Sequence, residues 1–435
     1  MPVNGCAFHR FEVRTTHAMN ERKLNTMKQI PFADLLAQET KRDPIAFSAR
    51  LREQGPLARL SSSPFGAGDG WIITNYEDAI AVLKDPRFIK DIHKLSPSSD
   101  EQVSDNKRAT VRGRFLTFRR DMLTVDPPDH TRLRGLVSKA FTPRMIEQLR
   151  PRVQQITDEL LDTVQDRGKM DLIADFAFPL PITVISEMLG IPVEDRPPFR
   201  VWSQTLVTST AGSEPEKALA AMETFVQYIK TLLAEKRAHP GNDLVSGLVH
   251  AEDGDDRLHE VEIISTIFLL IVAGHETTVN LIGNSVLALL QHPDQVNLLR
   301  ANPSLLLSAI EELLRYTAPV SLSSLRWANE DVPMHGEVIR KGEVVFVSLI
   351  GADTDTRQFS DPEVLDITRQ ENQHLAFGKG IHYCLGAPLA RLEGQIAIGT
   401  LLQRLPNLRL VNKPEQLAWT RSLILRGFTS LPVTF

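Results

Sequence analysis

The stretch from Glu260 to Gln291 constrains this chain most, because it reads as one long helix that is apolar on nearly every side. A helix of that kind must be buried, so other elements have to surround it. Its most apolar run, residues 263–274, is far shorter than the ~20 residues that cross a bilayer, and "HETT" follows it. We therefore expect a soluble domain built around this helix, with no membrane anchor.

Helices outnumber strands along the rest of the chain. The pattern predicts a strand hairpin over 57–74, a second hairpin across Lys341–Gly342, and helices at 75–85, 129–141, 142–149, 215–238, 303–318 and 386–405. Asn75 or Thr74 should cap the first helix, and Thr142 with Pro143 should start the third. No repeat or Gly/Ser linker divides the chain. The sequence thus predicts a mainly α fold with small β-sheets: one large helical domain with a minor β-rich part.

Composition excludes several classes of protein. Hydrophobic residues make up 42% and charged residues 24% of the chain, as in ordinary globular proteins, and the net charge of −5 gives no reason to expect nucleic acid. Two cysteines cannot form a disulfide framework and suit a reducing compartment, so we expect a cytoplasmic protein. We also expect a monomer. Residues 1–30 lack the apolar segment of a secretory signal. We interpret them as a disordered leader before a folded domain at 31–435.

Cys384 is the second of the two cysteines, and three ordinary roles compete for it. It could be a small core residue, a zinc ligand together with His374 and His382, or a nucleophile. However, three nearby glycines let the backbone approach a flat, bulky group without Cβ clashes. A helix start follows Cys384, and its N–H groups favour the thiolate. Such a thiolate is the axial ligand that supports O–O cleavage on a haem iron.

The stretch "FGKGIHYCLG", residues 377–386, resembles the haem-binding loop of the cytochrome P450 family at every fixed position. "EELLR" contains the family's Glu-x-x-Arg pair, and "AGHETT", residues 273–278, resembles its oxygen-activation segment. The resemblance runs from about residue 31 to the C-terminus and is strongest to soluble bacterial enzymes, including macrolide or polyketide hydroxylases and fatty-acyl oxidisers. It implies the cytochrome P450 fold and haem b (heme b, iron protoporphyrin IX) as cofactor.

The resemblance also implies a role for each matching residue. Cys384 would be the iron ligand. The residues expected to contact the cofactor are His130, Arg134, Arg326 and His382, at the propionates, together with Phe377, Gly378 and Ala273. Glu276 and Thr277 would relay protons at a point where the long helix opens, near Ala273–Gly274. From the residues alone, back-bonding of Thr277 and Thr278 to the preceding turn is the alternative.

A structural triad is expected behind the cysteine loop, formed by Glu312, Arg315 and Arg369. Spacing alone equally allows Glu312 and Arg315 to form a surface ion pair. The chain departs from the family where Leu365 replaces a frequent Phe and where "ADTDT", residues 352–356, replaces "ANRDP". We expect this segment to pack differently.

Substrate contacts are expected from 87–118, 200–212, 269–273, 320–324 and the turn near Leu423. Lys107 to Arg120 contains six basic residues and no acid, which fits a solvated face, or a contact for a substrate carboxylate or an acidic carrier protein. The apolar substrate would be a polyketide or macrolide, a fatty acid, or a terpenoid or steroid.

The resemblance implies a monooxygenase that takes electrons from a ferredoxin or flavodoxin with an NAD(P)H-dependent reductase. That partner would dock on a basic patch of Arg132, Lys139, Lys379 and Arg391. Two alternatives stay open: a peroxide-driven peroxygenase, and a haem-based sensor or carrier without turnover.

Overall fold

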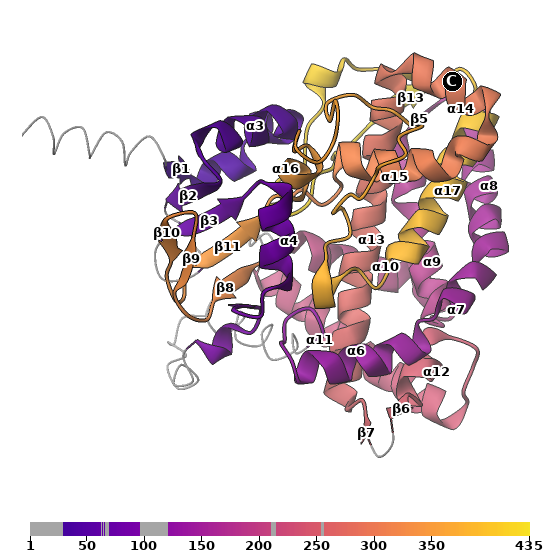
Figure 1. The fold of residues 1–435 in the computed structure, drawn as a ribbon. Helices are drawn as coiled ribbons and strands as arrows, with labels where there is room; N and C mark the ends of the chain where they lie inside the picture. The colour runs from indigo at the N-terminus through magenta and orange to yellow at the C-terminus, as the bar shows by residue number, and fades with distance from the viewer. Residues whose placement is uncertain are drawn as a thin grey trace, which may run out of the picture.

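The computed structural model describes residues 29–61, 63, 65, 69–95, 121–209, 215–253 and 256–435. A sheet with short helices beside it lies at one side, and a larger assembly of helices makes up the rest (Figure 1). The expected fold class, mainly α with small β-sheets, is confirmed. The chain is already in a strand at Gln29, two residues before the expected start of the folded domain, and residues 1–28 lie outside the described part.

The described helices are bounded as follows: α2 Gln38–Arg42, α3 Pro44–Gln54, α4 Tyr76–Lys84, α6 Asp129–Ala140, α7 Pro143–Gln148, α8 Arg150–Gln165, α9 Pro179–Met188, α10 Arg196–Ser209, α11 Pro215–Ala238, α12 Leu244–Val249, α13 Glu260–Gln291, α14 Pro293–Ala301, α15 Leu306–Thr317, α16 Leu349–Asp353 and α17 Ala387–Arg404. Sequence signals placed several ends well. Thr142 caps α7 by accepting a hydrogen bond from the Met145 backbone N–H at 3.2 Å, and Asn75 precedes α4.

The strands are β1 Gln29–Pro31, β2 Leu57–Ser61, β3 Gly70–Ile73, β4 Phe88–Ile89, β5 Lys169–Asp171, β6 Glu252–Asp253, β7 Asp256–Arg257, β8 Arg326–Ala328, β9 Val332–Met334, β10 Glu337–Ile339, β11 Val344–Val347, β12 Arg409–Leu410 and β13 Pro432–Thr434. The largest sheet has the order β1-β2-β3-β11-β8-β4. The first expected hairpin is present, because β2 and β3 pair antiparallel.

The hairpin expected across Lys341–Gly342 is wrong. β10 pairs instead with β9, across a turn in which His335 (φ 51°) and Gly336 (φ 80°) both adopt left-handed backbone angles. Two such residues form the turn that matches the twist of a tight hairpin, so the chain reverses one strand earlier. The fully buried strand β11 then joins the large sheet, parallel to β3 and antiparallel to β8.

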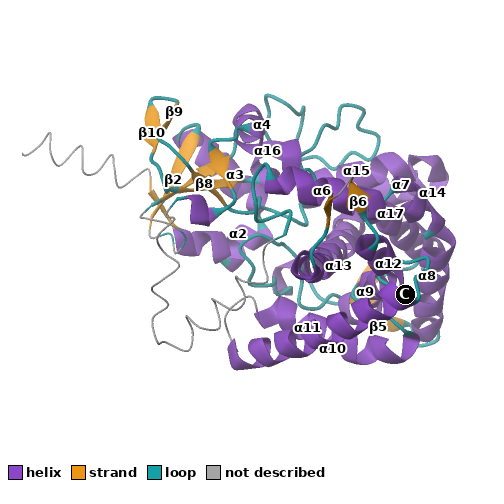
Figure 2. Cartoon of the chain, turned by 90° about the horizontal axis from the view of Figure 1, so that it is seen from below, coloured by secondary structure: helices purple, strands orange, loops and turns teal. Residues whose placement is uncertain are grey.

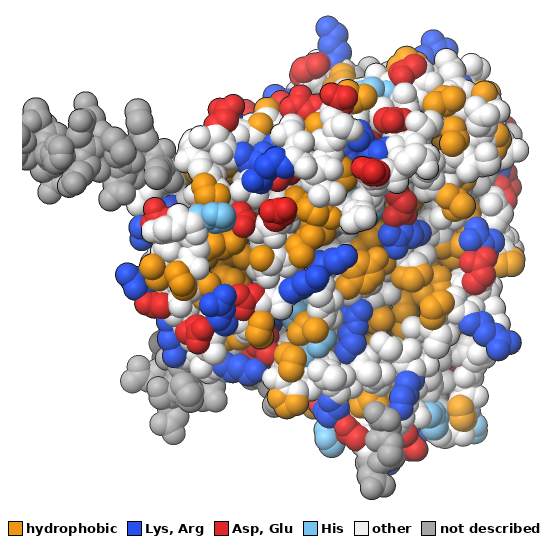
Figure 3. All heavy atoms as spheres, viewed as in Figure 1, with side chains coloured by type: hydrophobic (Ala, Val, Ile, Leu, Met, Phe, Trp, Pro, Cys, Tyr) orange, Lys and Arg blue, Asp and Glu red, His pale blue; other side chains and the backbone are white. Residues whose placement is uncertain are grey.

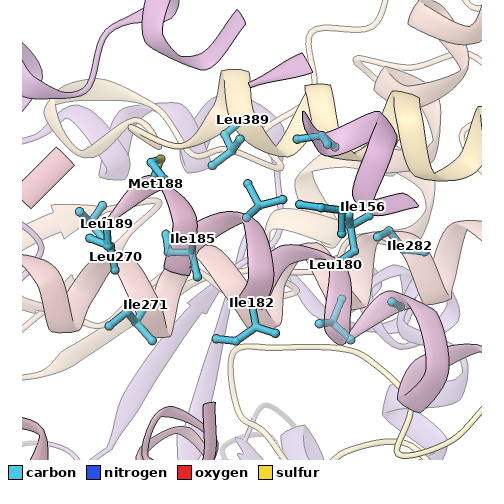
Figure 4. Packing of buried hydrophobic residues seen from close by; sticks show 14 of the residues in the cluster. Ile156, Leu180, Ile182, Ile185, Met188, Leu189, Leu270, Ile271, Ile282 and Leu389 are labelled. Atoms are coloured by element: carbon cyan, nitrogen blue, oxygen red, sulfur yellow. The ribbon is translucent and has the colours of Figure 1, made fainter. Parts of the chain in front are cut away.

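The long apolar helix is one unbroken element, α13, with the predicted bounds. Seen from below, it lies among the other helices (Figure 2). It contacts α9, α15 and α17. Figure 4 shows Ile185 and Met188 of α9 near Leu270 of α13 and Leu389 of α17, so α9 joins the two longer helices in one apolar core.

Length and composition alone would allow α13 to cross a membrane, although its most apolar run is short. No other described helix passes that test. The protein itself buries 56% of the residues in the most hydropathic window of α13. The core helix of a soluble protein passes the same test, so α13 is only weak evidence for a membrane span.

Candidate active site

Cys384 lies in a tight loop between the 3-10 turn Gly380–His382 and the start of α17. Its backbone N–H donates to the Phe377 carbonyl oxygen at 2.9 Å. Gly378 (φ 71°) and Gly380 (φ 77°) hold left-handed angles, and a Cβ on Gly380 would lie 2.9 Å from the Leu83 carbonyl oxygen. The loop therefore needs glycine at these positions, for backbone shape and for close contact with α4.

Cys384 is exposed as a whole residue, although protein atoms surround its thiol group. Burial raises the pKa of its thiol above the usual range. The backbone N–H groups of Gly386 and Ala387 and the charges of Arg134 and Arg391 act the other way, but they do not outweigh burial. The helix start thus favours the thiolate, as expected, but does not produce it alone. A bound metal cation would, because a coordinating thiol loses its proton.

Four of the predicted cofactor contacts meet beside this loop. The rings of His130, on α6, and His382 are 4.4 Å apart, edge to face. Arg134, one turn further along α6, donates to the Tyr383 carbonyl oxygen at 2.7 Å. Arg326 starts β8 and is buried. Burial, together with Lys90, His130, Arg326 and Arg134, lowers the pKa of His382 to about 2. We call this set, with Lys90, the cationic cluster: Arg134, Arg326 and Lys90 carry its positive charge, whereas the lowered pKa values of His130 and His382 leave both rings neutral at pH 7.

The cationic cluster has the chemistry to hold an anion. His130 is 3% exposed, and neither of its ring nitrogens has a hydrogen-bond partner in the described part of the chain. Buried polar atoms without a hydrogen bond cost free energy unless a ligand or a water molecule forms hydrogen bonds with them. The two propionates of a haem would supply acceptors, so these residues fit that cofactor. Sequence reasoning missed Lys90, which directly follows β4 and donates to the Ser324 hydroxyl.

The expected proton-relay residues lie on α13, which packs against α17. We expected the helix to open at Ala273–Gly274. Instead, it continues through these residues without a break. The hydroxyl of Thr277 donates to the Ala273 carbonyl oxygen at 2.6 Å, and that of Thr278 donates to Gly274 at 3.2 Å. This back-bonding is the alternative that the sequence left open, and it satisfies the hydroxyl hydrogens within the helix.

Glu276 differs from its neighbours on α13. Its carboxyl group makes no hydrogen bond to the described residues, and burial raises its pKa to about 7. A carboxyl group with that pKa can both give and accept a proton at neutral pH. Ala273, one turn earlier, is exposed.

The three residues of the expected triad are connected. Glu312 and Arg315, both on α15, are fully buried and joined by two bonds of 2.8 Å, so they are not a surface ion pair. Arg369 donates from Nε to both Glu312 oxygens at 3.2 Å. Arg315 also donates to the carbonyl oxygens of Asp353 and Pro362, which ties α15 to the segment before the cysteine loop.

Three further residues complete this region, and the sequence analysis missed them. Asn372 donates to Glu312 at 3.1 Å, and Asp353 accepts from the Leu375 backbone N–H at 2.6 Å. Glu393 of α17 is buried and contacts Thr278 of α13. Burial raises the pKa of Asp353 to about 7 and that of Glu393 to about 8. Leu365, where the family often has Phe, is buried in an apolar cluster beneath α15.

The predicted docking patch is only partly available. Arg132 pairs with Asp256 and Glu262, Lys139 donates to the Glu252 carbonyl oxygen, and Arg391 pairs with Glu311. Lys379 is exposed. Figure 3, viewed as Figure 1, shows basic and acidic side chains interspersed over the visible face of the molecule. The four residues therefore do not form a uniformly basic surface.

The segments expected to contact the substrate are described in part. Leu269 and Val272 of α13 are half-buried, and Ser321 and Leu322 are buried. The six basic residues between 107 and 120, and most of the segment 87–118, lie outside the described residues.

Comparison with known proteins agrees with this geometry. The model of the family "Cytochrome P450" matches residues 67–425. "Cytochrome P450 CYP107DY1" of Priestia megaterium is 54% identical, over 94% of this chain and 100% of its own. The structure of the Bacillus subtilis 168 "Bacillaene Polyketide Synthase (PKS) Cytochrome P450 PksS" superposes with a TM-score of 0.83 at 42% identity, covering 92% of this chain and 98% of that one.

A second solved structure is that of P450BioI "in complex with hexadec-9Z-enoic acid ligated Acyl Carrier Protein". It superposes with a TM-score of 0.81 at 40% identity, and covers 92% of this chain and 100% of that one. The family binds haem b, and the cysteine loop with its cationic cluster provides the matching residues. This chain belongs to the cytochrome P450 family of haem-dependent oxidoreductases.

Proposed function

We propose that this chain is a haem-thiolate monooxygenase, which inserts one atom of O2 into an apolar organic substrate and reduces the other to water. The observation that carries the proposal is the position of Cys384, just before α17 and beside the cationic cluster, where neither ring nitrogen of the buried His130 has a hydrogen-bond partner among the described residues. A thiolate ligand and two anchored propionates would fix a haem between this loop and the rest of the domain.

The bound haem would supply the O2 chemistry. The chain's own residues would bind it, exclude water and deliver protons. Cys384 would ligate the iron, Arg134 and Arg326 would neutralise the propionates, and the neutral rings of His130 and His382 would donate hydrogen bonds to them. Phe377, whose carbonyl oxygen holds the Cys384 N–H, would keep the sulfur in place.

We assign proton delivery to Glu276 and Thr277. Glu276, with a pKa of about 7, can lose a proton and regain it from solvent within each turnover. Thr277 directs its hydroxyl hydrogen to Ala273, so its oxygen lone pairs are left to accept a hydrogen bond. In this arrangement Glu276 is the acid, and Thr277 orients the group that receives the proton.

We propose an acyl or polyketide substrate, free or attached to a carrier protein, because the names of two similar structures mention a polyketide synthase and an acylated carrier protein. Bacterial cytochromes P450 use redox partners. A separate ferredoxin or flavodoxin with an NAD(P)H-dependent reductase would supply the electrons here, in the cytoplasm.

The test combines purified protein with a surrogate ferredoxin, its reductase, NAD(P)H and a panel of fatty acids, acyl carrier conjugates and polyketides. We expect a low-spin to high-spin shift with the substrate, followed by NAD(P)H-dependent formation of an oxygenated product. Spectral binding without product would point to a sensor or carrier. Product formed with hydrogen peroxide, but not with NAD(P)H, would point to a peroxygenase.

A further inference from the structure

Arg391 was expected to be a docking residue, but its side chain is held by an ion pair beside the cysteine loop. It lies in the second turn of α17 and donates from Nε and Nη2 to the two oxygens of Glu311, each at 2.7 Å. This bidentate pair fixes the plane of the guanidinium group. Both side chains are 30% exposed, so the pair lies at the boundary between the core and solvent.

The fixed guanidinium group covers the ring of Phe377. Its carbon atom lies 4.5 Å from the ring centroid, which is within the range of a cation–π contact. Phe377 in turn accepts the backbone hydrogen bond of Cys384 at 2.9 Å. A short path of contacts therefore joins Arg391 to the residue that carries the sulfur.

Glu311 holds the other end of the same loop. Its Oε2 atom is 3.1 Å from His374 Nε2, and His374 Nδ1 accepts the Ala376 backbone N–H at 3.2 Å. Burial would raise the pKa of Glu311, but hydrogen bonds from Arg391 and His374 hold it at about 2. One carboxylate thus links the chain before the loop, at His374, with the helix after it, at Arg391.

We infer that Arg391, held by Glu311, is a positioning residue that fixes Phe377 against the Cys384 loop and sets the reduction potential of the haem through its charge. This inference rests on the proposed ligation by Cys384. A positive charge near a redox centre favours the reduced state, which carries one more electron, and a negative charge disfavours it. The Arg391–Glu311 pair contains both charges, so removing either one should shift the potential in a predictable direction.

The experiment is a spectroelectrochemical titration of the haem-loaded protein with small-molecule mediators, so docking of a protein partner does not affect the result. Arg391→Leu should favour ferric haem by on the order of tenfold in the one-electron equilibrium constant, a fall of ~59 mV in potential. Glu311→Gln should shift the equilibrium in the opposite direction. The reduction potential of the double variant should return toward the wild-type value. Arg391→Lys keeps the positive charge, so its potential should stay close to that of the wild type.

Arg404 provides the matched control. It lies on the same helix and pairs with Asp162 at 2.6 Å, but it is 13 residues from Arg391, or about 20 Å along the axis. Arg404→Leu should leave the potential unchanged. If Arg391→Leu does not retain haem, Glu311→Gln and Arg391→Lys still carry the test.

Potentials that stay at the wild-type value in Arg391→Leu and Glu311→Gln would overturn the inference, as would shifts of the same sign in both. So would an Arg391→Lys protein shifted as far as Arg391→Leu. If Arg391→Leu has the wild-type potential and is slow only in its reduction by ferredoxin, Arg391 is a docking residue after all. The carbon monoxide spectrum of the wild type separates the two proposals: without a thiolate signature the proposed function fails, whereas with it only the role of Arg391 is in question.

Discussion

Two glutamates, the buried Glu312 on α15 and the half-buried Glu276 on α13, show how differently the two sides of this site are built. Both Glu312 oxygens are bonded several times, by Arg315, Arg369, Asn372 and a backbone N–H. Glu276 makes no hydrogen bond to the described part of the chain, and its pKa is raised to about 7.

Partners, and not residue type, decide what a buried carboxylate does. A carboxylate that is fully bonded to cations stays charged and rigid, and it holds the segments that carry its partners. A carboxylate without partners exchanges protons near neutral pH. The α15 side therefore has the properties of a scaffold, and the α13 side those of a proton donor.

The largest effect is expected from breaking the scaffold. Arg315→Ala would leave Glu312 buried with Arg369 as its remaining cation, at a cost of ~3–5 kcal/mol. We expect a large fall in the free energy of unfolding, measured with urea. We also expect that the purified variant does not retain haem. Arg340→Ala is the control, since the exposed Arg340–Asp331 pair should contribute less than about 1 kcal/mol. A stable, haem-replete Arg315→Ala protein that only turns over slowly would move Arg315 into the chemistry.

Glu276→Gln should have the next largest effect, and on rate instead of stability. Loss of a general acid slows a proton-transfer step by ~10²–10⁴-fold, and we expect turnover and O2 consumption to fall by about 10². Substrate binding and unfolding should change little. Glu260→Gln, at the exposed start of the same helix, should behave as the wild type. Weakened binding and stability in Glu276→Gln, without a specific loss of rate, would mean that Glu276 only shapes the helix.

The pH dependence of turnover sharpens the same assignment. Because the pKa of Glu276 is about 7, the protonated donor is present below that pH and is lost as pH rises through it. Wild-type kcat should therefore decline above about pH 7, whereas Glu276→Gln should lack this decline. Both profiles can be recorded with a saturating surrogate redox partner. The same decline in the two proteins would assign it to another group.

Thr277→Ala should have a smaller effect, and it should act on coupling, the amount of product formed per NAD(P)H consumed. The variant should bind haem and substrate and still consume NAD(P)H, but release more hydrogen peroxide and several-fold less product per NAD(P)H. Thr277→Ser keeps the hydroxyl and should restore coupling. Thr278→Ala should not alter coupling, because that hydroxyl is buried between Gly274 and Glu393. Unchanged coupling in Thr277→Ala would refute the orienting role.

The sequence predicted the elements with local signals. The bounds of α13, the cap at Thr142 and the first hairpin follow from apolar periodicity, capping residues and turn residues. The second hairpin was wrong, because a Lys-Gly pair looked like a turn while the tighter turn at His335–Gly336 had no recognised signal.

The site shows the same division. The family resemblance located Cys384, Glu312, Arg315 and the distant partner Arg369, but not Asn372, which also bonds Glu312. Lys90, Asp353 and Glu311 are brought to the site by tertiary packing, which leaves no periodic mark in the sequence. The expected opening in α13 was wrong because the threonine hydroxyls are satisfied by the preceding turn without a break.

The carbon monoxide difference spectrum of the reduced protein tests the central claim, ligation by Cys384, most directly. Wild type and a Cys6→Ala control, which removes the only other cysteine of the chain, should both show the red-shifted Soret band of a thiolate ligand. Cys384→Ala should lose that band, even where some haem remains bound. A Cys384→Ala protein that keeps the band would show that another residue ligates the iron, and would contradict the account.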